Sequence, residues 1–279
     1  MILDLVLYAA FMTIPFDRVQ HLVRVPVRIG GDDYRFLVDT GIGITVVSSG
    51  VAARADVRQT GDWVSARRMS GQEVRAPLVG LPEVTLGQHT VNGHLAGVSD
   101  LGEDFDGIVG PDFYAGRAIT IDPAARTMTL VDPAGVEGCE VPLRVRRQGL
   151  TVDAFVTLVL PSGRQVNVEV DTGSNNLILD TRFAGDCGID LDGPDVTTKT
   201  GTDETGHRWT RRWATVRGPI HLAAAPQTAQ DAARVQFQDI IYDGLIGTDY
   251  LDRYRHTIDF GGARMLLQDL ALPSHADRL

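Results

Sequence analysis

The stretch VEVDTGSNNLILD, residues 168–180, sets an aspartate and a glycine inside a run that otherwise has the apolar character of a strand. The tripeptide Asp-Thr-Gly also occurs in FLVDTGIGITVVSS, residues 36–49, again directly after an apolar run. One such tripeptide is typical of a strand that ends in a turn, with the aspartate capping the turn. Two tripeptides in matched surroundings indicate an internal repeat.

A second, longer pair of segments supports the repeat. FDGIVGPDFYAGRAITIDPAARTMTL, residues 105–130, aligns without gaps to YDGLIGTDYLDRYRHTIDFGGARMLL, residues 242–267. The tripeptides are 132 residues apart and the longer segments 137, so the second copy has five extra residues between its blocks. We interpret the chain as a duplication, and the Pro/Gly-rich join near 131–142 predicts an N-terminal lobe of residues 1–135 and a C-terminal lobe of residues 136–279.

The local patterns predict a mostly β protein. Short alternating or β-branched runs are bounded by Gly, Pro, Asp and Asn, and turn signals lie in VLPSGRQV, residues 159–166, and IDPAARTMTL, residues 121–130. Helices are expected to be short, one capped by Ser48 or Ser49 and one capped by Thr248 with Asp249. The Ala- and Gln-biased residues 222–233 are expected to form an exposed loop inserted in the second copy.

Composition limits the partners. The chain has 279 residues, 43% of them hydrophobic, and a formal net charge of −10, which argues against nucleic acid or an anionic membrane. Cys139 and Cys187 are read as free thiols. The apolar start, residues 1–12, is too short to span a bilayer and is a poor signal peptide, so we expect a buried strand there and a cytoplasmic protein. The histidines have no ligand-like spacing, and we expect neither metal nor cofactor.

The repeat gives the two aspartates a chemical role. A pseudo-twofold axis between the lobes would bring Asp39 and Asp171 face to face. Carboxyl groups that close share a proton, which supplies one base to activate a water and one acid to polarise an amide carbonyl. The glycine of each tripeptide permits close approach and donates its N–H to the carboxylate, and the threonine hydroxyls can bond across the axis. Four further repeated aspartates are read as turn residues: Asp106, Asp243, Asp122 and Asp259.

These motifs resemble those of the aspartic proteases. In that family two Asp-Thr-Gly loops are each paired with an apolar-apolar-Gly strand, here IVG at 108–110 and LIG at 245–247, and the resemblance covers nearly the whole chain. The beginning of the first copy, residues 13–41, is similar to the bacterial retropepsin-like members. The resemblance implies an all-β, bilobal pepsin/retropepsin-like acid protease fold, two homologous barrel-like lobes with a cleft between them. It implies the following residues: a catalytic pair, Asp39 and Asp171; supporting loop residues Thr40, Gly41, Thr172, Gly173 and Ser174, whose hydroxyl would support Asp171.

The chain departs from the family pattern in two places. Ile42 stands where the family usually has Ser, Thr or Ala, so Asp39 lacks the support that Ser174 offers Asp171. The family closes a hairpin flap over the substrate, and pepsin-like flaps carry a tyrosine that residues 60–80 lack. We expect flaps at residues 66–77 and 198–216. The candidate substrate-binding residues near them are Trp63, Met69, Trp209 and Trp213.

The predicted function is an aspartic endopeptidase-like hydrolase, a monomer that cleaves peptide bonds with an activated water. One alternative is an enzyme that uses the same pair for acid/base chemistry on a small biosynthetic substrate, by cyclisation, dehydration or hydrolysis. A shallow open cleft would favour a peptide and a closed pocket a small molecule. A second alternative is a non-catalytic peptide-binding module. A third, a homodimer that uses part of the duplication, is disfavoured because one chain supplies both halves.

Overall fold

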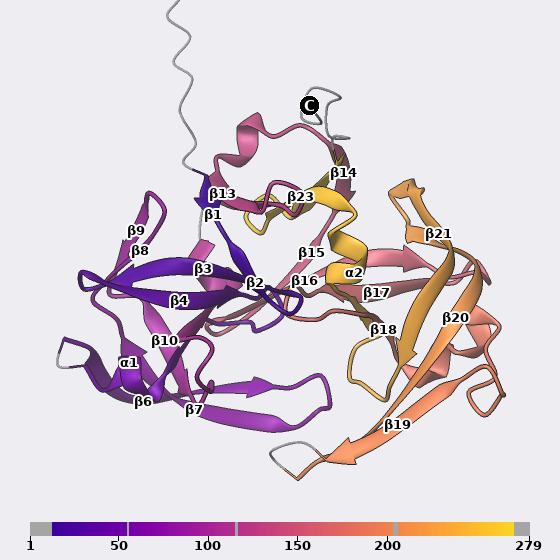
Figure 1. Ribbon diagram of the computed structural model, residues 1–279, viewed down its shortest axis with the longest axis horizontal. Helices are drawn as coiled ribbons and strands as arrows, with labels where there is room; N and C mark the ends of the chain where they lie inside the picture. Colours follow the sequence, from indigo (N-terminus) through magenta and orange to yellow (C-terminus); the bar gives the residue numbers. More distant parts are fainter. Residues whose placement is uncertain (1–12, 55, 115–116, 203–205, 271–279) are drawn as a thin grey trace, which may run out of the picture.

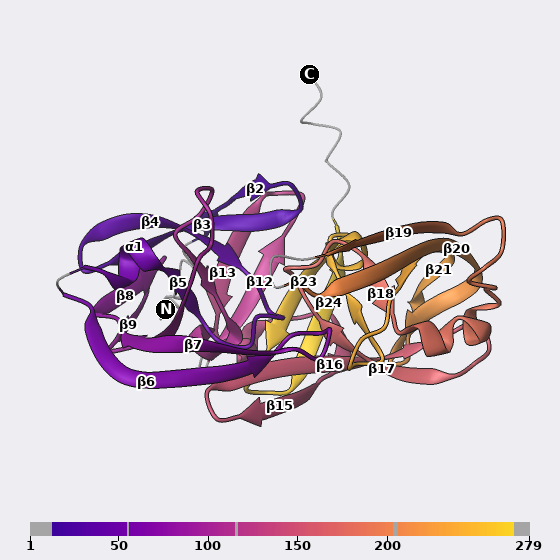
Figure 2. The same ribbon diagram turned by 90° about the horizontal axis from the view of Figure 1, so that it is seen from below.

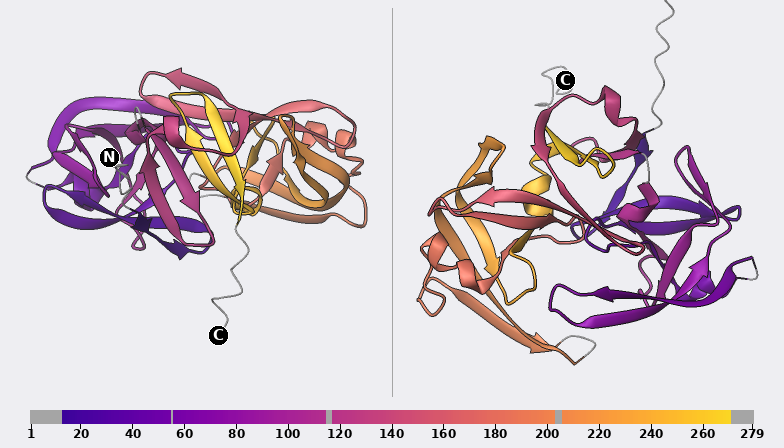
Figure 3. Two further views of the ribbon diagram at one scale, coloured as in Figure 1. Left: turned by 90° about the horizontal axis from the view of Figure 1, so that it is seen from above. Right: turned by 180° about the vertical axis from the view of Figure 1, so that it is seen from behind.

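The computed structural model describes residues 13–54, 56–114, 117–202 and 206–270. The strands form three sheets, one in each lobe and one shared between the lobes. In Figure 1 the N-terminal lobe lies on the left, the C-terminal lobe on the right, and the shared sheet above and between them. Figure 2 and Figure 3 show the same three parts from other directions. The predicted all-β, bilobal architecture is confirmed.

The shared sheet takes three strands from each half of the chain. In order they are β1 (Ile14–Pro15), β13 (Thr127–Val131), β12 (Ala118–Asp122), β23 (Tyr254–Asp259), β24 (Arg264–Asp269) and β14 (Cys139–Pro142). The two repeated Thr-Ile-Asp strands meet at its centre, where Thr120 pairs with Thr257 and their hydroxyls are 2.7 Å apart. The two edges match as well, with Ile14 beside Met128 and Val141 beside Met265. The two copies of the sequence repeat therefore pair their strands in the same way, related by a pseudo-twofold axis.

The N-terminal lobe is a ten-stranded sheet. Its order is β6 (Arg58–Arg67), β7 (Glu73–Gly80), β10 (Leu95–Ser99), β5 (Val46–Ser48), β11 (Gly107–Val109), β4 (Asp32–Val38), β3 (Leu22–Ile29), β8 (Glu83–Leu86) and β9 (His89–Asn92), with β2 (Asp17–Val19) beside β3. Strand β11, from the IVG segment, lies between the strand before the first Asp-Thr-Gly and the strand after it. This placement fixes both ends of that loop.

The C-terminal lobe repeats the arrangement with eight strands. Its order is β15 (Arg144–Gln148), β16 (Thr151–Val159), β17 (Gln165–Val170), β22 (Gly244–Ile246), β18 (Leu177–Leu179), β21 (Ala225–Phe237), β20 (Arg208–Leu222) and β19 (Thr197–Thr202). Strand β22, from the LIG segment, again lies between the strands on either side of the Asp-Thr-Gly. The predicted hairpins at 121–130 and 159–166 are confirmed as β12–β13 and β16–β17.

The predicted loop at residues 222–233 is wrong. Most of it belongs to the long strand β21, which pairs antiparallel with β20. Ala225, Thr228 and Ala233 are buried on that strand. The bias toward alanine and glutamine gave a weak strand signal, but pairing with a neighbour decides strand formation more than intrinsic preference does.

Helices are short, as predicted. The α-helices are α1 (Ser49–Ala52) and α2 (Thr248–Leu251), and the 3-10 helices are η1 (Pro111–Tyr114), η2 (Pro133–Gly135), η3 (Thr181–Phe183) and η4 (Gly185–Cys187). Ser48 caps α1 as expected by accepting a hydrogen bond from Val51 N. The cap predicted for α2 is wrong, because Gly247 holds the cap position and Thr248 is already helical, with its hydroxyl donating to Asn175 Oδ1 at 3.2 Å.

Most buried apolar side chains form one continuous core through both lobes and the shared sheet. Cys139 and Cys187 are free thiols. Within the described ranges no helix is long and apolar enough to cross a membrane. The buried strand expected at residues 1–12 lies outside the described residues, and the lobe boundary at 135/136 and the cytoplasmic location stay predictions.

Candidate active site

The two Asp-Thr-Gly loops begin where β4 and β17 end. Asp39 N donates to Val109 O at 3.1 Å, and Asp171 N donates to Ile246 O at 3.1 Å. In each lobe the acceptor belongs to the segment of the apolar-apolar-Gly repeat, which runs parallel to the strand before the loop. In each lobe the apolar-apolar-Gly segment therefore anchors the backbone of the Asp-Thr-Gly loop.

The threonines join the loops across the axis. Thr40 Oγ1 donates to Val170 O at 2.6 Å and accepts from Thr172 N at 3.1 Å. Thr172 Oγ1 donates to Val38 O at 3.1 Å and accepts from Thr40 N at 3.1 Å. Both side chains are at most 1% exposed. This reciprocal set satisfies every buried donor that it involves and ties the two strand ends together.

The glycines hold the carboxylates and let the loops approach. Gly41 N donates to Asp39 Oδ1 at 2.8 Å, and Gly173 N donates to Asp171 Oδ1 at 2.9 Å. A Cβ on Gly41 would lie 2.6 Å from Asp171 Cγ, and one on Gly173 would lie 2.3 Å from Asp39 Oδ2. Any side chain larger than hydrogen would displace the carboxylate of the opposite loop. The structure thus brings Asp39 and Asp171 together.

The environment of the pair favours a shared proton. Both aspartates are intermediate in solvent exposure, yet protein atoms surround each carboxyl group. Burial raises the pKa of Asp39, and burial followed by the charge of Asp39 raises the pKa of Asp171 well above its usual range. Backbone N–H groups of Ile42 and Ser174 oppose the rise on their own loops. One proton therefore stays on the pair at a pH where isolated carboxyl groups are ionised.

A cleft of about 630 Å³ lies beside the pair and takes its lining from both lobes. Gly41 and Asp171 line it together with Ile42, Glu169 and Tyr242. The N-terminal side continues into an apolar cluster that includes Leu37, Ile44 and Ile108. A cleft of this size that exposes one carboxyl of a buried pair is a setting for acid/base chemistry.

Both predicted flaps are hairpins. Residues 66–77 lie in the β6–β7 hairpin, whose turn is closed by Arg68 N donating to Gln72 O at 2.9 Å. Its tip reaches the other lobe, where Ile241 N donates to Met69 O at 2.9 Å. Strands β19 and β20 form the second hairpin, and in Figure 1 the two hairpins approach each other from opposite lobes. The tip of the first hairpin therefore covers part of the cleft.

The four candidate substrate-binding residues divide into two pairs. Met69 and Trp209 line the cleft. Trp63 and Trp213 do not belong to its lining, and a role of the four residues in substrate binding stays a prediction. Trp63 alternates with cleft-facing Val64 on β6 and is 56% exposed, and Trp213 lies farther along β20 beneath Lys199. Ser174 lies in the second loop, and the supporting role of its hydroxyl stays a prediction.

Sequence reasoning missed Glu169 and Tyr242. Glu169 is 2% exposed although it alternates with apolar residues on β17, a pattern that places it on the face away from the core. Tyr242 is the first residue of the second long repeat, where the first copy has Phe105. The one available signal was the exchange of Leu37 for Glu169 between the copies, two residues before each aspartate.

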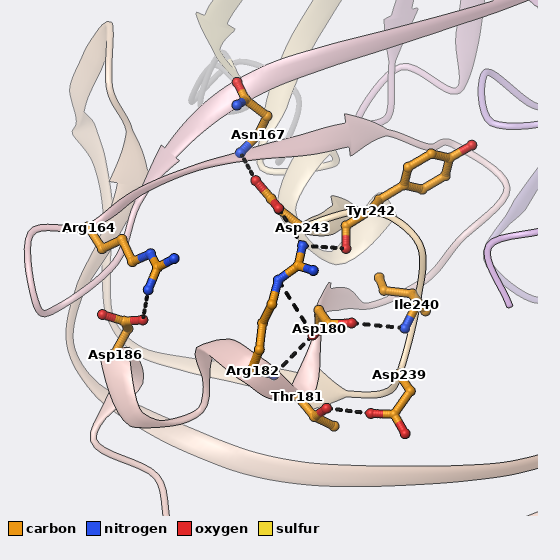
Figure 4. Close-up of polar contacts among 10 residues, drawn as sticks. All are labelled: Arg164, Asn167, Asp180, Thr181, Arg182, Asp186, Asp239, Ile240, Tyr242 and Asp243. Carbon is orange, nitrogen blue, oxygen red and sulfur yellow. Dashed lines mark hydrogen bonds and ion pairs between the residues drawn. The ribbon is translucent and has the colours of Figure 1, made fainter. Parts of the chain in front are cut away.

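A polar network fixes the segment that carries Tyr242, as Figure 4 shows. Asp180 Oδ2 accepts from Ile240 N at 3.0 Å. The carboxylate of Asp243 accepts from Asn167 N at 2.9 Å and from Arg182 Nη2 at 2.6 Å (Figure 4). Asp243 thus ties the turn to β17, as Asp106 does in the first copy by accepting from Arg35 N at 2.8 Å. The structural role predicted for these two aspartates fits these contacts.

Comparisons with known proteins agree with this geometry. Residues 25–113 match the model of a family described as aspartyl protease. An aspartic proteinase from Irpex lacteus has the same fold, with a TM-score of 0.59 over 95% of this chain and 99% of that chain, at 14% sequence identity. Residues 25–113 are thus similar to the aspartyl protease family in sequence, and the chain as a whole is similar to an aspartic proteinase in fold. A search of curated proteins found no match.

The family match and the fold together support an aspartic peptidase type of function and confirm the resemblance to pepsin-like and retropepsin-like proteins. The matched segment contains Asp39 and ends shortly after the IVG strand. The fold match extends over the second lobe, which contains Asp171. Within the described parts of this aspartic protease-like chain, no cluster of three or more His, Cys, Asp or Glu residues has metal-site geometry.

Proposed function

We propose that this chain is an aspartic endopeptidase that hydrolyses a peptide bond with a water held between Asp39 and Asp171. The observation that carries the proposal is the facing pair of buried carboxyl groups, each held by the N–H of its own loop glycine. The pair lies beside a cleft that both lobes line. A substrate lying across the cleft would contact both walls and the hairpin tip.

The chemistry needs one proton on the pair. The ionised carboxylate takes a proton from the water, whose oxygen attacks the carbonyl carbon, while the protonated carboxyl donates to the carbonyl oxygen. The resulting tetrahedral intermediate collapses when the C–N bond breaks and the leaving nitrogen takes a proton from the pair. No covalent bond to the protein forms. The threonine bonds across the axis hold both loops in place through these proton transfers.

The test is cleavage of a diverse peptide library between about pH 3 and pH 8, read by mass spectrometry, with Asp171→Asn as control. Cleavage that disappears in the variant supports the proposal. Because burial and mutual repulsion raise the pKa of the pair, we expect activity to extend to a higher pH than an ordinary carboxyl allows and to fall as pH rises through the upper pKa. Wild-type cleavage that persists unchanged in Asp171→Asn would exclude the paired mechanism.

A second candidate is acid/base chemistry on a small molecule by the same pair. The observation in its favour is the bond from Ile241 N to Met69 O, which holds the hairpin tip against the far lobe and reduces access for a long chain. A folded wild-type protein that cleaves no peptide, even after Met69 and its neighbours at 68–72 are replaced by a shorter turn, would favour this candidate. Cleavage that appears only in the shortened hairpin would favour a gated peptidase.

A further inference from the structure

The two strands that lead to the paired aspartates differ at one matched position. Leu37 and Glu169 each lie two residues before a catalytic-pair aspartate, on β4 and β17, and they are 3% and 2% exposed. Leu37 belongs to an apolar cluster with Ile44 and Ile108. Glu169 instead lines the cleft next to Asp171. The C-terminal wall therefore carries a second carboxyl group beside that of Asp171.

One oxygen of this carboxyl group is left without a hydrogen-bond partner. Within the described residues, Glu169 Oε1 is buried and has no hydrogen bond. Burial raises the pKa of Glu169 well above its usual range, and the charges of Asp171, Asp153 and Asp39 add to the rise. Buried polar atoms in native proteins almost always find partners, so an unpartnered oxygen on a residue that lines a cleft indicates a group that arrives with a ligand.

Arg146, whose positive charge opposes the rise in the pKa of Glu169, is already engaged. Arg146 Nε and Nη2 both lie 2.9 Å from Asp153 Oδ2, and Nη2 donates to Tyr242 Oη at 3.1 Å. The charge of Arg146 is thus balanced by Asp153, whereas the catalytic pair with one proton keeps a negative charge. The floor of the cleft beside Glu169 is therefore anionic on balance.

Other cations line the cleft from its hairpins, and their partners lie on the hairpins or at the end of β21. Arg67 lies 3.5 Å from Glu73, and Arg75 lies 5.6 Å from the centre of the Trp63 ring. Arg211 lies 4.4 Å from the centre of the Trp209 ring and donates to Gln238 Oε1 at 3.2 Å. Arg68 and His207, which also line the cleft, have interactions of their own. None of the contacts with a stated partner reaches Glu169.

We propose that Glu169 and Tyr242 form a subsite that binds the cationic side chain of a lysine or arginine next to the bond that is cleaved. The inference rests on the proposed peptidase function and assigns its specificity. The ring of Tyr242 and the side chain of Leu245, which also line the cleft, would pack against the methylene groups of that residue. The ammonium or guanidinium donates to Glu169, whose own proton leaves to solvent as the ion pair forms.

The first experiment uses pairs of peptides, one pair for each position around the cleaved bond. The two members of a pair differ only at that position, which is lysine in one and norleucine in the other. For wild type we expect one position at which lysine raises kcat/KM at least about tenfold over norleucine. Glu169→Leu, which copies the residue of the other lobe, and Glu169→Gln, which keeps the shape, should both lose that preference. Either variant suffices if the other does not fold.

The control is Glu83→Gln, which removes an exposed carboxylate on β8 outside the cleft lining and should keep the lysine preference. An unchanged preference in the Glu169 variants, or norleucine favoured by wild type at every position, would overturn the subsite. If wild type cleaves no peptide, the proposed peptidase function fails, and the subsite is tested on its own. Calorimetry then measures the binding of the same peptides. Tighter binding of the lysine peptide to wild type but not to Glu169→Leu supports the subsite, and equal binding of both peptides to wild type overturns it.

Discussion

The two lobes have the same loop geometry but different cleft walls. Around Asp39 and Asp171 the backbone anchors, the threonine bonds and the glycine contacts have matching partners in the two lobes. The residues at two further matched positions differ: the N-terminal lobe has Leu37 and Phe105 in an apolar cluster, and the C-terminal lobe has Glu169 and Tyr242 in the cleft lining. A shared proton requires symmetry at the pair, whereas each wall meets a different part of a substrate.

The largest expected effect tests the symmetry of the pair. Asp39→Asn and Asp171→Asn should each lower kcat by at least about a thousandfold, because either change removes the exchange of one proton between two carboxyl groups. The measurement is kcat on a peptide found in the library, with circular dichroism to establish that each variant is folded. Substantial activity in one variant but not in the other would mean that the lobes are chemically unequal.

A smaller loss of activity should follow from a methyl group in either loop. Gly41→Ala and Gly173→Ala place a Cβ under 3.0 Å from the opposite carboxylate, so the pair must shift. A displacement of about 1 Å at reacting groups costs about a hundredfold in rate, and we expect losses of that order from both variants. The matched control is Gly185→Ala, since a Cβ there meets nothing within 4 Å. Wild-type rates in both loop variants would contradict the close approach.

The threonine bonds should appear as stability rather than rate. Thr40→Val and Thr172→Val each leave two buried backbone groups, one carbonyl and one N–H, without the hydroxyl that pairs with them, at a cost of about 1–3 kcal/mol of the free energy of unfolding for each unsatisfied group. Urea unfolding of the two variants should give similar losses, because the bonds are reciprocal. Each change removes its own two bonds of the set, so a double variant whose loss departs from the sum would show that each loop holds the other in place. Fully additive losses would mean that the threonines act independently.

The smallest effect sharpens the difference between the walls. The folded state raises the pKa of Glu169, so the native protein holds this proton more tightly than the unfolded chain, and its contribution to stability falls as pH rises above the usual glutamate pKa of about 4.3. Glu169→Leu removes this dependence and should raise the free energy of unfolding by about 1 kcal/mol or more at pH 7, and by less at pH 4. Urea unfolding at pH 4 and pH 7 measures the free energy of unfolding, and Glu83→Gln is expected to leave it unchanged at both pH values. An equal effect at both pH values would contradict an elevated pKa.

Much of the fold and of the pair could be predicted from the sequence. The repeated tripeptides and the apolar-apolar-Gly segments are local patterns, and their hairpins and loops follow from turn chemistry. The alanine- and glutamine-rich part of β21 has a weak strand preference, so its sequence favours a loop. Pairing with β20 makes it a strand. The cap of α2 was misplaced by one residue, since Gly247 lies in the extended conformation just before the helix.

The positions of single side chains in the cleft were harder to predict. Met69 and Trp209 lie in the lining, but Trp63 and Trp213 do not. The face of a hairpin that meets the cleft depends on how the hairpin packs against the rest of its lobe, which local sequence does not specify. The same uncertainty hid Tyr242, whose place is set by contacts of Asp180, which follows β18, and of Asp243, which precedes β22. These contacts join residues far apart in the chain.

The sequence by itself determined that this protein has two repeated lobes, each with one Asp-Thr-Gly loop, because a tripeptide after an apolar run specifies its own local backbone. Only the tertiary structure decided that the loops interlock through Thr40 and Thr172 and that Glu169 is buried in the cleft wall. The physical reason is that alternation along a strand tells which side chains share a face, whereas what covers that face depends on packing between elements distant in the chain.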